Sequence, residues 1–149
     1  MIKEQYKYSE ITAKILKSAF EVHKILGNGF QACLPKGFVA CRQEVIYQRA
    51  LEDEFKLQEL DFKREFEMPI FYKEKLIGTR RVDFLVEKVI SVELKAIIKL
   101  EDVHLSQALN YLEAYNLEIG MLLNFGAKSL EYKRLINPKF NQLNQKNQL

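Results

Sequence analysis

Two neighbouring segments, 81–86 and 89–95, carry an apolar side chain at every even-numbered position, and this pattern constrains the fold most. Successive side chains of a β-strand point to opposite faces of the sheet, so a period of two is typical of strands. The apolar even positions are Val82, Phe84, Val86, Ile90, Val92 and Leu94. The pattern predicts two adjacent strands whose even-numbered side chains share a core face.

The connection between these segments fixes which residues face one another. If they form a hairpin, the shared core face requires an odd number of connecting residues, such as Glu87-Lys88-Val89. Val86 then pairs with Ile90, and Asp83 lies opposite Glu93 with Cβ atoms roughly 5 Å apart. Lys95, two residues beyond Glu93, points the same way.

Two facing carboxylates need a compensating interaction. At ~4.5 Å and an effective dielectric constant near ~20, their repulsion is roughly 3–4 kcal/mol, whereas a favourable cross-strand pair contributes only ~0.2–1 kcal/mol. A shared proton, a neighbouring Lys95 or Arg81, or a bound divalent cation could offset it. Mg²⁺ suits the residue types, because it is usually held by one or two carboxylates. On the alternation alone, an ordinary charged sheet surface is an equally good interpretation.

The rest of the chain alternates between helical and strand patterns. Apolar spacing predicts helices over 9–26, 43–60 and 102–115, with Ser9 and Asp102 as N-caps. Strand patterns cover 61–67, 69–72, 117–125 and 130–136, besides the central pair. This order predicts an α/β fold with a mixed central β-sheet flanked by α-helices. We expect a single domain over 1–137 and a flexible tail over 138–149, which is rich in Asn, Gln and Lys.

Composition limits the functional classes. The net charge of +3 over 149 residues permits nucleic-acid binding without requiring it. Neither a signal peptide nor a run of ~18 apolar residues is evident, so we expect a cytoplasmic protein without a membrane partner. Cys33 and Cys41 have no neighbouring histidine and cannot complete a four-ligand zinc site, which favours free thiols over a regulatory disulfide.

Asp83 followed by Glu93-Leu94-Lys95 resembles the signature of the PD-(D/E)XK nuclease superfamily, an acidic residue on one strand and Glu-x-Lys on the next. Further segments are similar to the bacterial GxxExxY protein family: Glu44-Val45-Ile46-Tyr47, Arg80-Arg81-Val82-Asp83, His104 with Gln107-Ala108-Leu109-Asn110-Tyr111, and Asn124-Phe125-Gly126. The likeness covers about 11–137 in the same order. It implies a restriction-endonuclease-like core and hydrolysis of DNA or RNA phosphodiesters with Mg²⁺ or Mn²⁺.

The resemblance also assigns roles. Asp83 and Glu93 would hold the metal, Lys95 would position or activate water, and Glu44 would be a third acidic catalytic residue. In the family the Gly-x-x-Glu-x-x-Tyr motif is contiguous, whereas here about 32–43 separates Gly29-Phe30-Gln31 from Glu44. We interpret this segment as an inserted loop, which costs little free energy in a fold.

Other residues could support the site or bind substrate. Gln107 and Tyr111 lie four apart on a predicted helix, so they share a face and form an auxiliary pair. Arg80, Arg81 and Lys99 could contact phosphates, which require positive charge rather than base recognition. Nucleic acid is the expected partner, and a homodimer is expected by analogy, since superfamily nucleases often dimerise.

Three functions are compatible with the sequence. The leading one is a metal-dependent nuclease, because Asp83, Glu93 and Lys95 are all present. The second is a catalytically inactive nucleic-acid-binding module, and the third is a protein-interaction module on the same fold.

Overall fold

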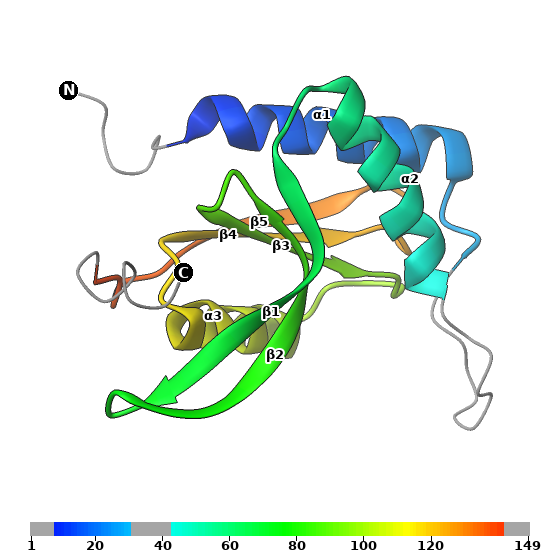
Figure 1. The fold of residues 1–149 in the computed structure, drawn as a ribbon. Helices are drawn as coiled ribbons and strands as arrows, with labels where there is room; N and C mark the ends of the chain where they lie inside the picture. The colour runs from blue at the N-terminus through cyan, green and yellow to red at the C-terminus, as the bar shows by residue number, and fades with distance from the viewer. Residues whose placement is uncertain (1–7, 31–42, 142–149) are drawn as a thin grey trace. The chain divides into compact units, whose positions relative to one another are not determined.

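The computed structural model describes residues 8–30 and 43–141 (Figure 1). The elements are α1 (Ser9–Leu26), α2 (Gln43–Leu57), β1 (Phe62–Tyr72), β2 (Lys75–Val86), β3 (Ile90–Lys95), α3 (Asp102–Tyr115), β4 (Ile119–Asn124) and β5 (Glu131–Ile136). The strands form one mixed sheet in the order β1-β2-β3-β4-β5. The predicted α/β class, a mixed sheet flanked by helices, is confirmed.

The elements group into two compact units, and the first contains α1, α2 and the segments Leu94–Leu100 and Leu123–Tyr132. Tyr47 of α2 is fully buried and stacks on Phe125, with ring centroids 4.8 Å apart. Its hydroxyl donates to the carbonyl oxygen of Gly27, 2.9 Å away, at the end of α1. The tyrosine of the Glu-x-x-Tyr motif is therefore a core residue that ties the two helices together.

The second unit contains β1, β2, the first part of β3, α3, the first part of β4, and most of β5. Its apolar core cluster is made of Met68, Val82, Leu85, Leu112, Tyr115 and Leu117. Leu112 and Tyr115 are the contribution of α3, so this helix packs on the strands β1 and β2 through its last turn.

The central hairpin follows the predicted register. Val86 pairs with Ile90, Leu85 with Ser91 and Phe84 with Val92, in antiparallel fashion. The connection is the predicted three residues, and its Glu87 and Lys88 adopt left-handed backbone angles, with φ of 53° and 62°. All six even-numbered apolar side chains are buried, as the alternation predicted.

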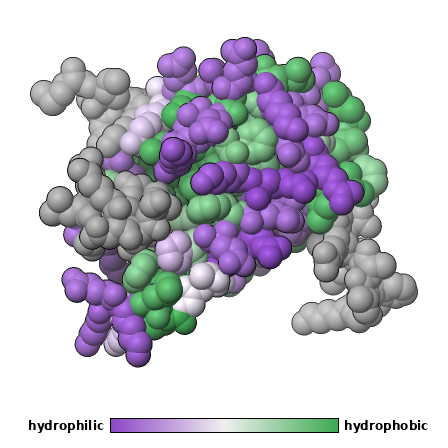
Figure 2. Space-filling model, in the orientation of Figure 1, coloured by the Kyte–Doolittle hydropathy of each residue, from purple (hydrophilic) through white to green (hydrophobic). Residues whose placement is uncertain are grey.

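The other hairpin, β1–β2, is longer than the sequence pattern indicated. Residues 61–67 and 69–72 were expected as two strands, but they form the single strand β1, and β2 begins at Lys75 rather than Arg80. Pro69 is tolerated because β1 is the edge strand of the sheet, where a missing N–H need not break a ladder. Figure 2 shows apolar side chains at the outer end of this hairpin, where Leu76 and Ile77 are exposed.

Two predicted helix caps are displaced by one residue. Tyr8 is the N-cap of α1, and Ser9 is its first helical residue. Glu101 is the N-cap of α3, where its backbone N–H donates to Nδ1 of His104 over 2.9 Å. The imidazole thus satisfies a donor that would otherwise be left open at the helix start, which explains the position of His104.

The second helix is slightly shorter than its apolar spacing predicts, since it ends at Leu57 rather than Leu60. Asn141, within the predicted tail, exchanges two hydrogen bonds with Asn116, at 2.6 and 2.9 Å.

Several predictions fall on residues outside the described ranges. These are the expected inserted loop except for Gln43, which begins α2, the cysteines Cys33 and Cys41, and residues 142–149 of the predicted tail. No helix in the described ranges is long and apolar enough to cross a membrane.

Candidate active site

Asp83 and Glu93 come together at the point where the β2–β3 ladder ends. The last registered pair is Phe84 with Val92, and these two acidic residues are the next ones outward on their strands. Both are half-buried, and their carboxyl groups interact through charge and through a side-chain hydrogen bond. The predicted carboxylate pair is therefore present in the structure.

The surroundings make ionisation of this pair unfavourable. Burial raises the pKa of Glu93, the negative charge of Asp83 raises it further, and Arg80 only partly opposes this, so that the pKa reaches about 7. A hydrogen bond between two carboxyl groups needs one proton, which fits a carboxyl pKa near neutrality. The raised pKa of Glu93 therefore favours a proton held between the two carboxyl groups near neutral pH.

Arg80 supplies the positive charge at this pair. Its Nη1 lies 2.7 Å from Oε1 of Glu93 and 2.8 Å from the hydroxyl of Tyr115, and it donates to both. Burial lowers the pKa of Arg80, but the attraction of Glu93 and the bond to Tyr115 outweigh burial and raise it above its ordinary value. The guanidinium is therefore a permanent cation held against the acidic pair.

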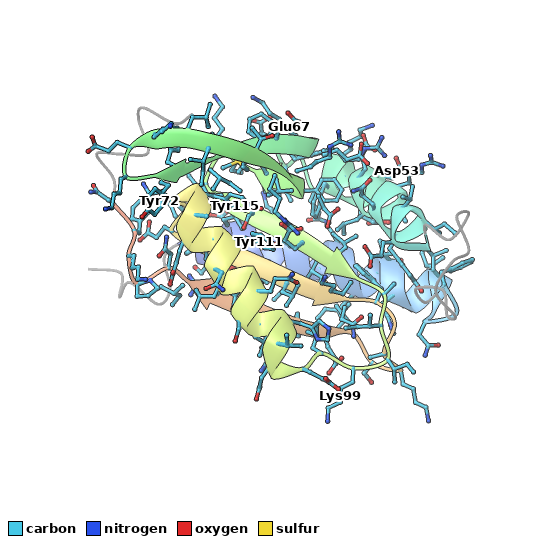
Figure 3. The ribbon with its side chains drawn as sticks, turned by 90° about the horizontal axis from the view of Figure 1, so that it is seen from below. Asp53, Glu67, Tyr72, Lys99, Tyr111 and Tyr115 are labelled. Atoms are coloured by element: carbon cyan, nitrogen blue, oxygen red, sulfur yellow. The ribbon has the colours of Figure 1, made fainter. Side chains whose placement is uncertain are left out.

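Two tyrosines of α3 hold this guanidinium. Its central carbon lies 3.7 Å from the ring centroid of Tyr111, and this ring stacks on Tyr115 with the two centroids 6.2 Å apart. Figure 3 labels both tyrosines on α3. The two tyrosines are four residues apart, so they share one face of the helix. Burial is the main reason that the pKa of Tyr115 rises to about 12, so its hydroxyl stays protonated.

An interruption of strand alternation brings Arg80 to this face. On a regular strand, residues an odd number apart face opposite sides of the sheet. Val82 and Leu85 are three residues apart, and yet both lie in the core cluster that includes residues of α3. The β1–β2 register passes from Phe66–Val82 to Arg64–Phe84 without a pair at Glu65, whose φ is 52°. The expectation that all even-numbered side chains share one core face is thus wrong at Val82. Local irregularities of this kind re-aim side chains in strands.

The same interruption separates Arg81 from the pair. Strict alternation placed Arg81 beside Asp83, but its side chain is 60% exposed and lies 3.9 Å from each of Glu65 and Glu67. Arg80 takes the place predicted for Arg81. Sequence reasoning also missed Tyr115, although its spacing from Tyr111 was a usable signal.

The other predicted site residues lie on several elements. Gln107 is exposed on α3, one turn before Tyr111. Lys95 is half-buried on β3, two residues beyond Glu93, and belongs to the first unit. Glu44 and Lys99 also belong to that unit. Glu44 is half-buried in the first turn of α2, and Lys99 lines an open pocket with Asn28, Lys128 and Glu131. The structure groups Asp83, Glu93, Arg80 and Tyr111, while the contributions of Lys95, Glu44 and Lys99 stay predictions.

The oxygen donors of the pair suit a hard divalent cation. Within the described residues, no three His, Cys, Asp or Glu side chains converge to form a complete protein metal site. Two carboxylates are nevertheless sufficient for Mg²⁺ when waters and substrate phosphates supply the other ligands. The unfavourable ionisation of Glu93 is a further reason for a cation to bind there.

A mixed sheet of this kind is consistent with the restriction-endonuclease-like fold. The family model of the PD-(D/E)XK nuclease superfamily matches residues 9–135, and the chain belongs to this superfamily. Nucleases of the superfamily generally use divalent metals.

Among solved structures, the chain is similar to the crystal structure of SSO0001, with a TM-score of 0.50 and 20% sequence identity. The match covers 90% of this chain and 60% of that one, so the chain spans about three fifths of the length of the protein it matches. This likeness supports the fold alone. No curated protein matches the chain.

Proposed function

We propose that this chain is a metal-dependent nuclease of the GxxExxY branch that hydrolyses phosphodiester bonds of DNA or RNA. The observation that carries the proposal is the Asp83–Glu93 pair, which the fold keeps together although burial and like charge disfavour its ionisation. A structural role alone would not require two facing acids, since a favourable cross-strand pair would be more stable.

Asp83 and Glu93 are the proposed ligands of Mg²⁺ or Mn²⁺. When bound, such an ion stabilises charge on phosphoryl oxygens and lowers the pKa of bound water. Glu93 can serve as a ligand only in its ionised form, so displacement of its proton accompanies its use as a ligand. Glu44 is proposed as a third acidic catalytic residue.

Lys95 is the proposed partner of the attacking water. Hydrolysis adds one water across a P–O ester bond and gives a phosphate monoester and a free hydroxyl. A lysine two residues from Glu93 on the same strand has the charge to orient that water or to bind a phosphoryl oxygen. Its ammonium would have to act from the same side of β3 as the Glu93 carboxylate, which the strand alternation favours.

Nucleic acid is the proposed partner, and several residues are proposed to contact it. Arg80, Arg81 and Lys99 would bind phosphates through charge, which gives affinity without sequence recognition. Tyr111 and Gln107 would support the site from α3, the first through the Arg80 guanidinium that it stacks against.

The test is cleavage of a panel of plasmid, linear duplex, single-stranded DNA and RNA with Mg²⁺ or Mn²⁺. We expect cleavage by the wild-type chain that EDTA abolishes, none by Lys95→Ala, and wild-type cleavage by Lys75→Ala, an exposed lysine in the β1–β2 hairpin. Cleavage that persists in Lys95→Ala would contradict the assigned site.

One observation favours the alternative of a protein-interaction module. Tyr72, Leu76 and Ile77 at the end of the β1–β2 hairpin are 60%, 56% and 60% exposed. Exposed apolar groups of this kind often mark contact surfaces. An interaction module without a metal site would show no stabilisation by Mn²⁺, whereas a ligand that binds the folded state raises the unfolding temperature. Salt-sensitive nucleic-acid binding without cleavage would indicate the inactive binding module.

A further inference from the structure

The positive charge beside the acidic pair belongs to the chain itself. Asp83 and Glu93 carry two negative charges when both are ionised, and Arg80 neutralises one of them through its bond to Glu93. A divalent cation would neutralise both. Arg80 thus supplies part of the charge neutralisation that a divalent cation would provide.

The contacts of Arg80 fall into two groups. One is the 2.7 Å bond from its Nη1 to Oε1 of Glu93. The other is the support from α3, namely the Tyr115 hydroxyl at 2.8 Å and the Tyr111 ring at 3.7 Å. Only the first group competes with a cation. The second involves neutral groups and would persist if Glu93 were engaged elsewhere.

A divalent cation and a guanidinium repel each other, so both are disfavoured on the same carboxylate oxygen. When Glu93 becomes a ligand, Arg80 loses one acceptor but keeps its aromatic support. Its freed N–H groups then need another acceptor, and a phosphate oxygen is the group that a guanidinium binds best, often through two bonds.

We propose that Arg80 is an exchangeable counter-ion: it pairs with Glu93 until a divalent cation binds, and then transfers to a phosphate of the nucleic acid while Tyr111 and Tyr115 keep it in place. Tyr111 and Tyr115 are positioning residues in this scheme. The inference rests on the proposed nuclease function and adds that metal binding prepares the site for a phosphate.

Arg81 provides a matched control one residue away. It carries the same charge, but it lies by Glu65 and Glu67 and is 60% exposed. Arg80→Gln and Arg81→Gln therefore change the net charge equally, and only Arg80→Gln removes the cation from the pair. General electrostatic attraction predicts equal effects of the two variants on metal affinity, whereas the exchange predicts a difference.

The experiment is calorimetric titration of the full chain with Mn²⁺, without nucleic acid, at pH 8.5 to limit competition by protons. Removing a charge-assisted bond that competes for Glu93 should tighten Mn²⁺ binding about tenfold in Arg80→Gln. Arg81→Gln should bind Mn²⁺ within about twofold of wild type.

A second titration measures binding of a fluorescent DNA duplex in Ca²⁺. Arg80→Gln should bind the duplex about tenfold more weakly, although its metal affinity has risen. These opposite changes distinguish the exchange from a merely structural role, which would weaken both. Arg80→Lys guards against a folding defect: it keeps the charge, so Mn²⁺ affinity should stay near wild type, while duplex binding should fall because the planar fork is lost.

Unchanged or weaker Mn²⁺ binding by Arg80→Gln, or equal tightening in Arg81→Gln, would overturn the exchange. Glu93→Gln separates this failure from failure of the proposed function. If Glu93→Gln abolishes Mn²⁺ binding and Arg80→Gln does not tighten it, only the exchange is wrong. If Glu93→Gln leaves Mn²⁺ binding intact, or no variant binds Mn²⁺, the metal site itself is misassigned.

Discussion

Arg80 and Glu93 lie on adjacent strands with Nη1 and Oε1 2.7 Å apart, and this ion pair is the electrostatic centre of the candidate site. The glutamate is only 16% exposed, so water screens the interaction poorly. Even so, the pKa of Glu93 is raised, because burial and Asp83 together outweigh Arg80. One arginine does not fully balance this acidic pair.

The raised pKa of Glu93 predicts a pH dependence of stability. The folded state, with a Glu93 pKa of about 7, holds a proton that the unfolded chain, with the ordinary value of 4.5, has already released. The free energy of unfolding should therefore fall as the pH rises from about 4.5 to 7. Glu93→Gln should flatten this slope in urea titrations at several pH values, whereas Glu67→Gln, at an exposed position, should leave it unchanged. An equal slope in Glu93→Gln would contradict the assignment.

Tyr115→Phe should destabilise the second unit. The variant removes a buried hydroxyl that accepts a hydrogen bond from Arg80, and bonds to charged groups contribute about 1.5–3 kcal/mol. We expect the free energy of unfolding to fall by an amount of that order, which urea denaturation would show as a lower midpoint. Tyr132→Phe, whose side chain is more exposed, should change the midpoint little. Equal midpoints for Tyr115→Phe and wild type would show that the Arg80–Tyr115 bond contributes nothing.

Gly126→Ala should destabilise the first unit strongly. An added Cβ would overlap with both the backbone nitrogen and the backbone oxygen of Ile97, and backbone atoms cannot move aside cheaply. The cost should be about 1–3 kcal/mol or more, measured by thermal or urea unfolding. Gly78→Ala is the control, because nothing lies within 4 Å of its added Cβ. Similar stability of the two variants would contradict the close approach at Gly126.

Lys88→Gly should stabilise the β2–β3 hairpin. Lys88 has φ of 62°, and a non-glycine residue in this left-handed region costs roughly 1–2 kcal/mol. Part of the gain is lost to the greater entropy of glycine in the unfolded chain, so we expect about 1 kcal/mol more stability. Lys75→Gly, in a strand, should instead destabilise the chain. A loss of stability in Lys88→Gly would contradict the left-handed turn.

The sequence predicted the parts of the fold that depend on local pattern. Even-numbered apolar residues predicted the β2–β3 register, and the meeting of Asp83 with Glu93 at the end of this ladder followed from it. The limits of α1 and α3 also agreed, because their apolar spacing and stop signals are local. The alternation predicts two strands, 61–67 and 69–72, where the structure has the single strand β1, whose edge position tolerates Pro69.

The arrangement of side chains around Arg80 could not be predicted from a local sequence pattern. Alternation pointed to Arg81, and the interruption near Asp83 depends on how Val82 and Leu85 pack together in one cluster with Tyr115. Tyr115 is far from Arg80 in sequence, so only the tertiary structure reveals their bond. Departures from local rules of this kind are expected at functional sites.

If Asp83 and Glu93 together hold a divalent cation, Mn²⁺ should raise the unfolding temperature of the chain. We expect a rise in the wild-type chain that grows with Mn²⁺ concentration and is absent in Asp83→Asn, because a ligand of the folded state must stabilise it. An equal rise in Asp83→Asn, or no rise in the wild-type chain, would contradict the claim.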